Sequence, residues 1–298
     1  MLSICIPAFN YDIRLLVQSL HRQAEAANIS YEIIVIDDDS EERFKHQNCA
    51  ILSLKNVVYT ELSENIGRAA IRNLLAKTAK YPYLIFMDCD AELPDNAFLS
   101  RYLALCTREI ICYGGRTYAP SPLRTDWFFR WHYGVQRECP SADLRNLHPN
   151  RSFITFNFLV SKSIMERLTF DTELTGYGHE DTLFGYSLSR ADIQVTHIDN
   201  PLIHVGLENS FSFIQKTENG IRNLLFLYKK TNYNRQLADD IKLLRYYIWC
   251  KKYDAHLFIV PLFRLFKPLF LKNLHGKTPN LVVFDLYKLG FMLRKAEN

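Results

Sequence analysis

The chain has 298 residues, of which 48% are hydrophobic and 23% are charged. This is the composition of an ordinary globular protein, and it excludes wholesale disorder. The net charge of +4 is unevenly distributed: residues 229–298 contain 14 Lys and Arg against 5 Asp and Glu and so carry +9, while residues 1–228 carry −5. We therefore expect a main domain of residues 1–228 and a basic C-terminal extension of residues 229–298 with an anionic partner.

The cysteines and the apolar runs of the sequence indicate the cellular compartment of the protein. The seven cysteines have no CxxC spacing, so neither a disulfide framework nor a zinc site is expected. Residues 1–7 lack the basic segment of a signal peptide and are typical of a first strand. No apolar run reaches the roughly 18 residues that a transmembrane helix needs. The sequence predicts a reduced, cytoplasmic protein, and no nucleic-acid partner is expected.

Strands and helices alternate in the first part of the chain. Apolar or β-branched runs predict strands at residues 2–7, 31–37, 57–60 and 83–88. Apolar residues at helical spacing predict helices around residues 13–20 and 68–79. This alternation predicts an α/β fold with a mostly parallel sheet flanked by helices.

The second part of the chain is less regular. Between residues 114 and 150 prolines and aromatic residues interrupt the periodicity, and a stretch of this length is functional or contains short elements of its own. We then expect a strand at 153–160, a short helix from Ser163 with Glu166 at capping-box spacing, a helix at 181–191 and a strand at 193–197. From residue 211 the chain is expected to be mostly helical.

Acidic residues directly follow two of the predicted strands, as Asp88 and Asp90 after one and as residues 37–39 after another. Ligands of open α/β sheets bind beyond the carboxyl ends of the strands, so both clusters are expected on one rim. Between Asp88 and Asp90, Mg²⁺ or Mn²⁺ would remove the repulsion between carboxylates and a diphosphate. A solvated turn is the alternative interpretation.

The cluster at residues 37–40 suits a nucleotide. Asp38 is interpreted as an acceptor for a base or ribose donor, with Asp39 and Ser40 forming the turn. A helix N-cap formed by Asp39 or Ser40 is the alternative.

Two further segments carry candidate residues. In residues 65–73, Gly67 precedes a helix whose Arg72 could pair with a phosphate or orient Asp88. The alternative interpretation is that Arg72 is a solvent-exposed helical arginine without a role in binding. In residues 176–181, Glu180 and Asp181 open a helix, where a general base or a simple acidic cap is expected.

One histidine is a candidate ligand. His204 ends a short apolar run and could complete the coordination shell of a metal. The alternative is that it is a core histidine whose ring nitrogens are hydrogen-bonded within the protein, which is the more frequent case for a lone histidine. His179 is interpreted as structural.

Taken in order, these motifs resemble those of bacterial family 2 glycosyltransferases of the GT-A fold. The matching segments are residues 2–10, 36–40, 65–73, 86–90 and 176–181. The resemblance covers roughly residues 1–205, and five motifs in order are far more specific than any one of them. Asp39 departs from the family, which usually has glycine or asparagine before the serine.

The resemblance implies which residues bind the nucleotide part of the donor. Pro7, Ala8 and Phe9, with Asn10 beside them, would line the nucleotide base, and Asp38 would bond to its ring nitrogen.

It also implies a metal and a base. Asp90 would ligate Mn²⁺ or Mg²⁺, Asp88 would contact the ribose or a metal-bound water, and His204 would be a further ligand. Asp181 would be the catalytic base, with Glu180 beside it binding donor or acceptor sugar.

The implied activity is an inverting, metal-dependent transfer of a sugar from a nucleotide-sugar, in first place a UDP-sugar, to an acceptor hydroxyl. The acceptor would be a saccharide or a lipid-linked sugar in surface polysaccharide or glycolipid synthesis. Residues 116–150 and 153–180 are expected to set sugar and acceptor choice.

The extension leaves its partner open. Residues 257–271 are apolar and basic and contain prolines that are expected to break them. They would lie on the inner face of the plasma membrane, or else cover the sheet or form a homodimer.

Three rival functions are considered. A sugar nucleotidyltransferase needs a basic, Gly-rich loop after the first strand, and an oxidoreductase needs GxGxxG there; residues 7–11 provide neither. A non-catalytic nucleotide-sugar-binding module would be expected to lose its carboxylates, yet Asp38, Asp90 and Asp181 are present.

Overall fold

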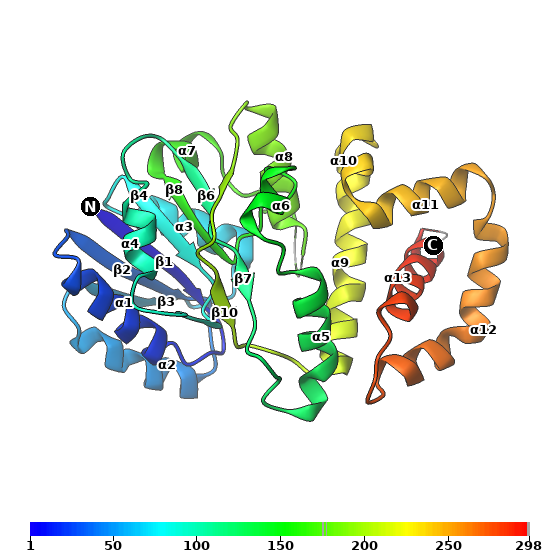
Figure 1. Cartoon of the computed structure of the whole chain (residues 1–298), viewed down its shortest axis with the longest axis horizontal. Coiled ribbons are helices and arrows are strands. Elements are labelled where there is room, and N and C mark those ends of the chain that lie inside the picture. Colours follow the sequence, from blue (N-terminus) through cyan, green and yellow to red (C-terminus); the bar gives the residue numbers. More distant parts are fainter. Residues whose placement is uncertain (175, 177, 297–298) are drawn as a thin grey trace. The chain divides into compact units, whose positions relative to one another are not determined.

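The computed structural model describes residues 1–174, 176 and 178–296, and these form two compact units. The first unit contains Met1–Ala119, Glu138–Glu173 and Glu180–Gly206, and the remaining described residues belong to the second. Figure 1 shows the helices and strands, coloured from the N-terminus to the C-terminus. The boundary expected after residue 228 falls inside helix α9 (Ser210–Lys230), and this helix belongs as a whole to the second unit.

A mixed sheet is the centre of the first unit. Within the described residues it has seven strands in the order β3-β2-β1-β4-β8-β6-β9. The strands are β1 (Leu2–Ala8), β2 (Tyr31–Asp37), β3 (Val57–Glu61), β4 (Tyr83–Met87), β6 (Ile111–Tyr113), β8 (Asn157–Ser161) and β9 (Thr196–His197). β1 to β4 are parallel, whereas β8 runs antiparallel to β4 and β6. The predicted α/β fold with a mostly parallel sheet is confirmed.

Helices cover both faces of this sheet (Figure 1). One face packs on α1 (Arg14–Ala26), the short helix η1 (Cys49–Ser53) and α4 (Phe98–Leu103), and the other on α3 (Arg68–Thr78), α7 (Lys162–Arg167) and α8 (Glu180–Arg190). α2 (Glu42–Asn48) leads into η1. Side chains alternate between the faces, so Ile4 and Ile6 of β1 pack with α1 while Cys5 packs with α3. Burial on both faces explains why these strands are continuous apolar runs.

Two strands are shorter than the sequence predicts. β8 begins at Asn157, since Phe153 instead packs against Phe184 of α8. β9 contains only Thr196–His197, because the side chain of Asn150 hydrogen-bonds with Ile193 O at 2.8 Å and Val195 N at 3.0 Å. An apolar run predicts burial, but only the partner strand decides which residues join the ladder.

A second, three-stranded sheet was not predicted. It has the order β5-β10-β7 and is formed by β5 (Ala91–Glu92), β10 (Leu202–His204) and β7 (Arg116–Thr117). β10 pairs antiparallel with β5, placing His204 opposite Ala91. This small sheet therefore brings the end of the first unit back to the residues that follow β4.

The irregular stretch from residue 114 to 150 contains short elements of its own, as one of its two interpretations predicted. Besides β7 these are η2 (Thr125–Trp127), α5 (Phe128–Arg137) and α6 (Ala142–Asn146). The expected capping box of α7 is wrong, since Ser161 is the N-cap and Ser163 lies inside the helix, where its hydroxyl bonds to Glu109.

The second unit is helical, as predicted from residue 211 onward. It contains α5 and α9, followed by α10 (Arg235–Asp240), α11 (Lys242–Lys252), α12 (His256–Leu274) and α13 (Leu281–Lys295). α13 contacts α9, α11 and α12, so it forms the middle of this unit's core. α12 continues through Pro261 and Pro268, which corrects the expected break. Within the described part of the chain, no helix is long and apolar enough to cross a membrane.

Candidate active site

The acidic clusters lie on one rim of the main sheet. β1 pairs in parallel with both β2 and β4, with Ala8 opposite Asp37 and Cys5 opposite Phe86. The segments that follow β2 and β4 therefore leave the sheet at the same edge. All the candidate residues predicted from the sequence lie in the first unit.

The segment after β2 forms a tight turn. Asp39 adopts a left-handed backbone conformation with φ of 62°, which explains why the related family usually has glycine or asparagine at this position. Asp37 is fully buried; its Oδ1 accepts from Ser40 N at 2.7 Å and its Oδ2 accepts from Tyr59 OH at 3.1 Å. Asp39 and Ser40 thus have the turn-forming role predicted for them, while the N-cap of α2 is Glu41.

Asp38 connects this turn to the start of α3. Its Oδ1 accepts from Ile66 N at 2.7 Å and its Oδ2 from Gly67 N at 3.0 Å, and Asn65 Nδ2 donates to the Asp38 carbonyl at 2.9 Å. Burial raises the pKa of Asp38, although the two N–H donors oppose the shift. The backbone N–H groups that precede α3 therefore bind the Asp38 carboxylate. Each carboxylate oxygen keeps a second lone pair for a ligand.

The loop after β1 lies next to that turn. Asn10 has φ of 51°, and its N–H donates to Ser40 Oγ at 2.8 Å. Ala8 is buried, whereas Phe9 leaves half of its surface exposed. An exposed ring that follows a buried strand end is available to a flat ligand such as a base.

Arg72 is buried between two carboxylates. Its Nη2 donates to Asp88 Oδ1 at 2.7 Å, and its Nη1 lies 3.7 Å from Glu180 Oε1, which is also 3.7 Å from Arg68 Nη1. Only 2% of the Arg72 side chain is exposed, so the interpretation as a solvated helical arginine is wrong. The guanidinium instead orients Asp88, as one sequence interpretation proposed, and links β4 to the first turn of α8.

Asp90 and His204 form a second pair. Asp90 Oδ2 lies 3.1 Å from His204 Nε2, because the pairing of β10 with β5 brings His204 beside the residues after β4. The bond from Val205 N to Asp90 O, 3.0 Å long, holds the two segments together. Gly206 approaches so closely that an added Cβ would lie 2.4 Å from Asp90 Oδ2. Burial alone would raise the pKa of Asp90, but the charge and hydrogen bond of His204 lower it.

Three residues of this site were missed by the sequence analysis. Tyr118 OH donates to Glu138 and lies 3.4 Å from His204 Nδ1, so it connects the histidine to a carboxylate. Arg116 pairs with Glu138 at 2.9 Å, and its guanidinium lies over the ring of Phe156. The glycines at 114 and 115, which end a strand just before these residues, were the available sequence signal.

Asp181 lies in the first turn of α8, directly after buried Glu180. Burial raises the pKa of Asp181 to about 6, and the charge of Glu180 adds to the rise, while the N–H of Thr182, 2.7 Å from Asp181 Oδ1, opposes it. The charge of Arg116 acts on Asp181 as well as on Asp90. Tyr177, part of the predicted motif that precedes this helix, lies outside the described residues.

α8 is held at the site by Asn73 of α3. Asn73 Nδ2 donates to Phe170 O and Asn73 Oδ1 accepts from Phe170 N, both at 2.9 Å. The Phe170 ring stacks on Phe184 of α8 with 4.2 Å between centroids. The Arg-Asn pair of α3 thus positions both Asp88 and the helix that carries Asp181.

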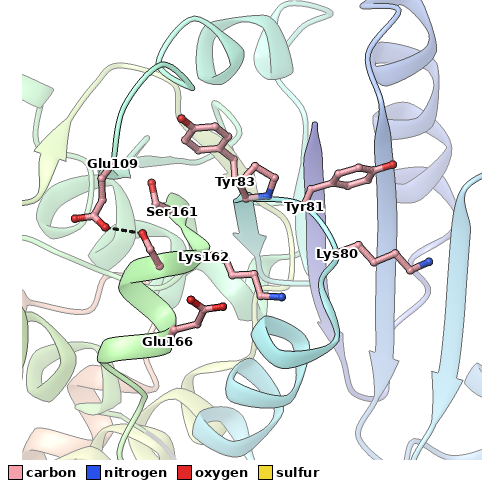
Figure 2. A pocket seen from close by; sticks show the side chains of 9 residues that line it. Lys80, Tyr81, Tyr83, Glu109, Ser161, Lys162 and Glu166 are labelled. Carbon is pink, nitrogen blue, oxygen red and sulfur yellow. Dashed lines mark hydrogen bonds between the residues drawn. The ribbon is translucent and has the colours of Figure 1, made fainter.

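A hollow at the opposite end of the sheet does not belong to this site. It is lined by residues around the start of β4 and the end of β8, including Tyr83 and Lys162 (Figure 2). Two of the lining residues are joined by a hydrogen bond that the Ser163 hydroxyl donates to Glu109. None of the candidate residues predicted from the sequence lines it.

The sequence model described as glycosyl transferase family 2 matches residues 3–169, which is more than half of the chain. The chain belongs to glycosyl transferase family 2. A chondroitin synthase of Escherichia coli is 28% identical over 221 residues, a match that covers 63% of this chain and 32% of that protein. This family 2 chain therefore spans about a third of the relative's length.

Solved structures show the fold of this family 2 chain. The mannosyltransferase PcManGT from Pyrobaculum calidifontis, in complex with GDP-Man and Mn²⁺, superposes with a TM-score of 0.60 at 13% identity, covering 100% of this chain and 86% of that one. GalNAc-T7 with UDP, GalNAc and Mn²⁺ gives 0.51 at 16% identity over 70% and 43% of the two chains. The fold is the GT-A fold, as the resemblance implied.

The Asp90–His204 pair fits a divalent cation. Two ligands about 2.1 Å from an octahedral cation lie about 3 Å apart, close to the separation of Asp90 Oδ2 and His204 Nε2. Tyr118 OH donates to Glu138, so its oxygen can accept from His204 Nδ1–H and leave Nε2 free to ligate. Among the described residues no group of three His, Cys, Asp or Glu side chains is arranged around a metal, and Asp88 is turned to Arg72.

Proposed function

We propose that the protein is a metal-dependent, inverting glycosyltransferase that moves a sugar from a nucleotide-sugar to an acceptor hydroxyl. The first candidate for the donor is a UDP-sugar. The observation that carries this proposal is the separation of roles among the carboxylates of one site. Asp88 and Asp90 have positive or ligating partners, whereas Asp181 is buried beside a second acid and has a pKa of about 6. A carboxyl group in that range suits a general base near neutral pH.

The reaction we propose is a single displacement. Asp181 accepts the proton of the acceptor hydroxyl, the hydroxyl oxygen forms a bond to the anomeric carbon, and the bond between that carbon and the diphosphate oxygen breaks. The nucleoside diphosphate leaves with the electron pair. Attack opposite to the leaving group inverts the anomeric centre, and one base on the acceptor side is sufficient. General base catalysis typically contributes about 10²–10⁴-fold.

The donor would bind along the rim. The nucleotide base would be held by Phe9 together with Pro7, Ala8 and Asn10. Asp38 would accept a hydrogen bond from the ring N–H of the base, through the carboxylate lone pairs that are not used by the backbone N–H groups before α3. Asp88, oriented by Arg72, would contact the ribose or a metal-bound water.

Asp90 and His204 would hold the divalent cation, with Tyr118 and Glu138 orienting the histidine. When bound, the cation offsets the charge that develops on the departing diphosphate. Glu180, held by Arg68 and Arg72, would bind a sugar hydroxyl.

The acceptor we propose is a saccharide or a lipid-linked sugar in surface polysaccharide or glycolipid synthesis. The likeness to a protein named chondroitin synthase supports a sugar acceptor. We place the reaction in the cytoplasm, at the inner face of the plasma membrane, because the C-terminal region from residue 229 is basic and rich in apolar residues.

The decisive variant is Asp181→Asn. It should abolish sugar transfer and leave UDP binding with Mn²⁺ intact, as measured by thermal stabilisation, because the base is lost while the donor site is unchanged. Asp192→Asn is the matched control, since it makes the same change at an exposed position just after α8. Near-normal turnover by Asp181→Asn would refute the assignment.

Donor identity has its own experiment. Thermal stabilisation is measured with UDP-sugars and GDP-sugars, each with Mn²⁺ and with Mg²⁺, and the stabilising donor is then tested for metal-dependent hydrolysis. Stabilisation without turnover would favour the rival function, a non-catalytic nucleotide-sugar-binding module.

A further inference from the structure

Helix α12 exposes a row of large apolar side chains. Six of them have between 41% and 75% of their surface accessible. They are Leu257, Phe258, Leu262, Leu265, Phe266 and Leu269, and together they are called here the outer face of α12. An exposed apolar patch of this kind marks an interaction surface.

The outer face is not needed to hold α12 in place. The opposite side of the helix carries the packing residues, among them buried Val260 and Phe263. The Phe263 ring lies 5.6 Å from that of Tyr287 in α13 and so close to Gly290 that an added Cβ would lie 2.3 Å from it. The covered and the exposed apolar residues lie on opposite sides of the helix, so α12 has two apolar sides, of which only one is covered.

The charged side chains of α12 itself are all basic. Residues 255–284 contain no Asp or Glu, and Arg264 and Lys272 are exposed on α12 itself. α11, which precedes α12, adds exposed Trp249 and Tyr246, residue types that are enriched at membrane–water interfaces.

These basic side chains favour an anionic lipid surface over a second copy of the chain as the partner of the outer face. In a dimer through the outer face, two helices whose charged side chains are all basic would face each other, and like charges at an interface cost free energy. An anionic lipid surface attracts the same side chains while its hydrocarbon region accepts the leucine and phenylalanine side chains. α12 is about 28 Å long, so it can lie in the plane of the interface along its whole outer face.

We propose that the outer face of α12 is a membrane-docking surface that lies in the headgroup region of a bilayer containing anionic lipid. This surface is separate from the residues proposed to carry sugar transfer. Its consequence is that the protein binds vesicles through α12 whether or not it holds a donor.

The experiment is vesicle flotation of the full chain. Vesicles of phosphatidylcholine alone are compared with vesicles of phosphatidylcholine and phosphatidylglycerol, at low and high salt. The double variant Leu262→Glu/Leu265→Glu replaces two side chains of the outer face. The control is Leu15→Glu, which changes a leucine on α1 that is even more exposed, with 78% of its surface accessible.

We expect the wild type and the control to float with the anionic vesicles and to be released at high salt. The double variant should partition about 100-fold more weakly or worse, since each buried leucine contributes about tenfold or more. Thermal stabilisation of both variants by UDP and Mn²⁺ should match that of the wild type. A loss of membrane docking is thus distinguished from a loss of donor binding, because flotation measures the first and thermal stabilisation the second.

Two outcomes would overturn the proposal. One is equal flotation of the double variant and the wild type, or no flotation of either. The other is a wild type that elutes as a dimer, does not float, and becomes monomeric in the double variant, since the outer face would then join two copies of the chain.

Discussion

At the scale of single residues, the site depends on how each carboxylate is partnered. Asp88 has a buried guanidinium, Asp90 has an imidazole, and Asp181 has the carboxylate of Glu180 as its neighbour in the chain. An opposite charge stabilises the ionised form of an acid, while burial and a like charge destabilise it. The pKa of Asp90 is therefore lowered while that of Asp181 is raised, although both aspartates belong to one site.

The pH dependence of transfer follows from Asp181. The base must be ionised, and burial together with Glu180 raises its pKa to about 6. We expect kcat/KM to be level above pH 6 and to fall about tenfold per pH unit below it. In Glu180→Gln the acid limb should move to lower pH, because one cause of the raised pKa is removed. An acid limb that does not move in this variant would assign the titration to a different group.

The Tyr118 hydroxyl is expected to set metal affinity. It lies 3.4 Å from His204 Nδ1 and donates to Glu138, so Tyr118→Phe removes the group that orients the histidine. Loss of such a partner typically weakens metal binding about 10–100-fold. The measurement is a Mn²⁺ titration of thermal stability in the presence of UDP. Tyr83→Phe, at the far end of β4, is the control; equal titrations for the two variants would contradict the role of Tyr118.

At the scale of elements, α3 organises the site. The two N–H groups just before it bind Asp38. Its Arg72 binds Asp88, and its Asn73 binds the backbone of Phe170, whose ring stacks on α8. One helix thus contacts the segments that carry the proposed nucleotide, metal and base groups. An error in the position of α3 would misplace all three.

Asn73→Ala tests this arrangement. The change leaves the N–H and carbonyl of Phe170 without their partner and should lower the free energy of unfolding by about 1–3 kcal/mol. Because Phe170 stacks on α8, kcat should fall as well. Urea denaturation and initial rates measure the two effects. Asn96→Ala, at an exposed position, is the control, and a loss of stability without loss of kcat would limit Asn73 to a structural role.

At the scale of the whole molecule, the residues proposed for sugar transfer and those proposed for membrane docking are different. The described residues of the first unit contain every candidate site residue, whereas the outer face of α12 belongs to the second unit. The charge follows the same division, since the last 70 residues carry a net charge of +9 although the chain as a whole carries +4. A variant in one unit can therefore be used to test one function at a time.

Much of the fold was predictable because local patterns and burial agree. β2 was predicted at its observed limits, and β1, β3, β4 and α3 to within a residue, since strands covered on both faces are continuous apolar runs and helices repeat every three to four residues. The two acidic clusters were correctly expected on one rim, because parallel strands end at the same edge.

The chain order of motifs, the α/β fold and the identity of the candidate acids were thus determined by the sequence by itself. Tertiary structure decided the partners: the pairing of β10 with β5 puts His204 beside Asp90, and the packing of α3 buries Arg72 against Asp88. It also decided that α12 is continuous and that one of its apolar sides stays uncovered. The physical reason is range, since propensity and periodicity act over a few neighbouring residues, whereas these contacts join residues that are 16 to 114 positions apart.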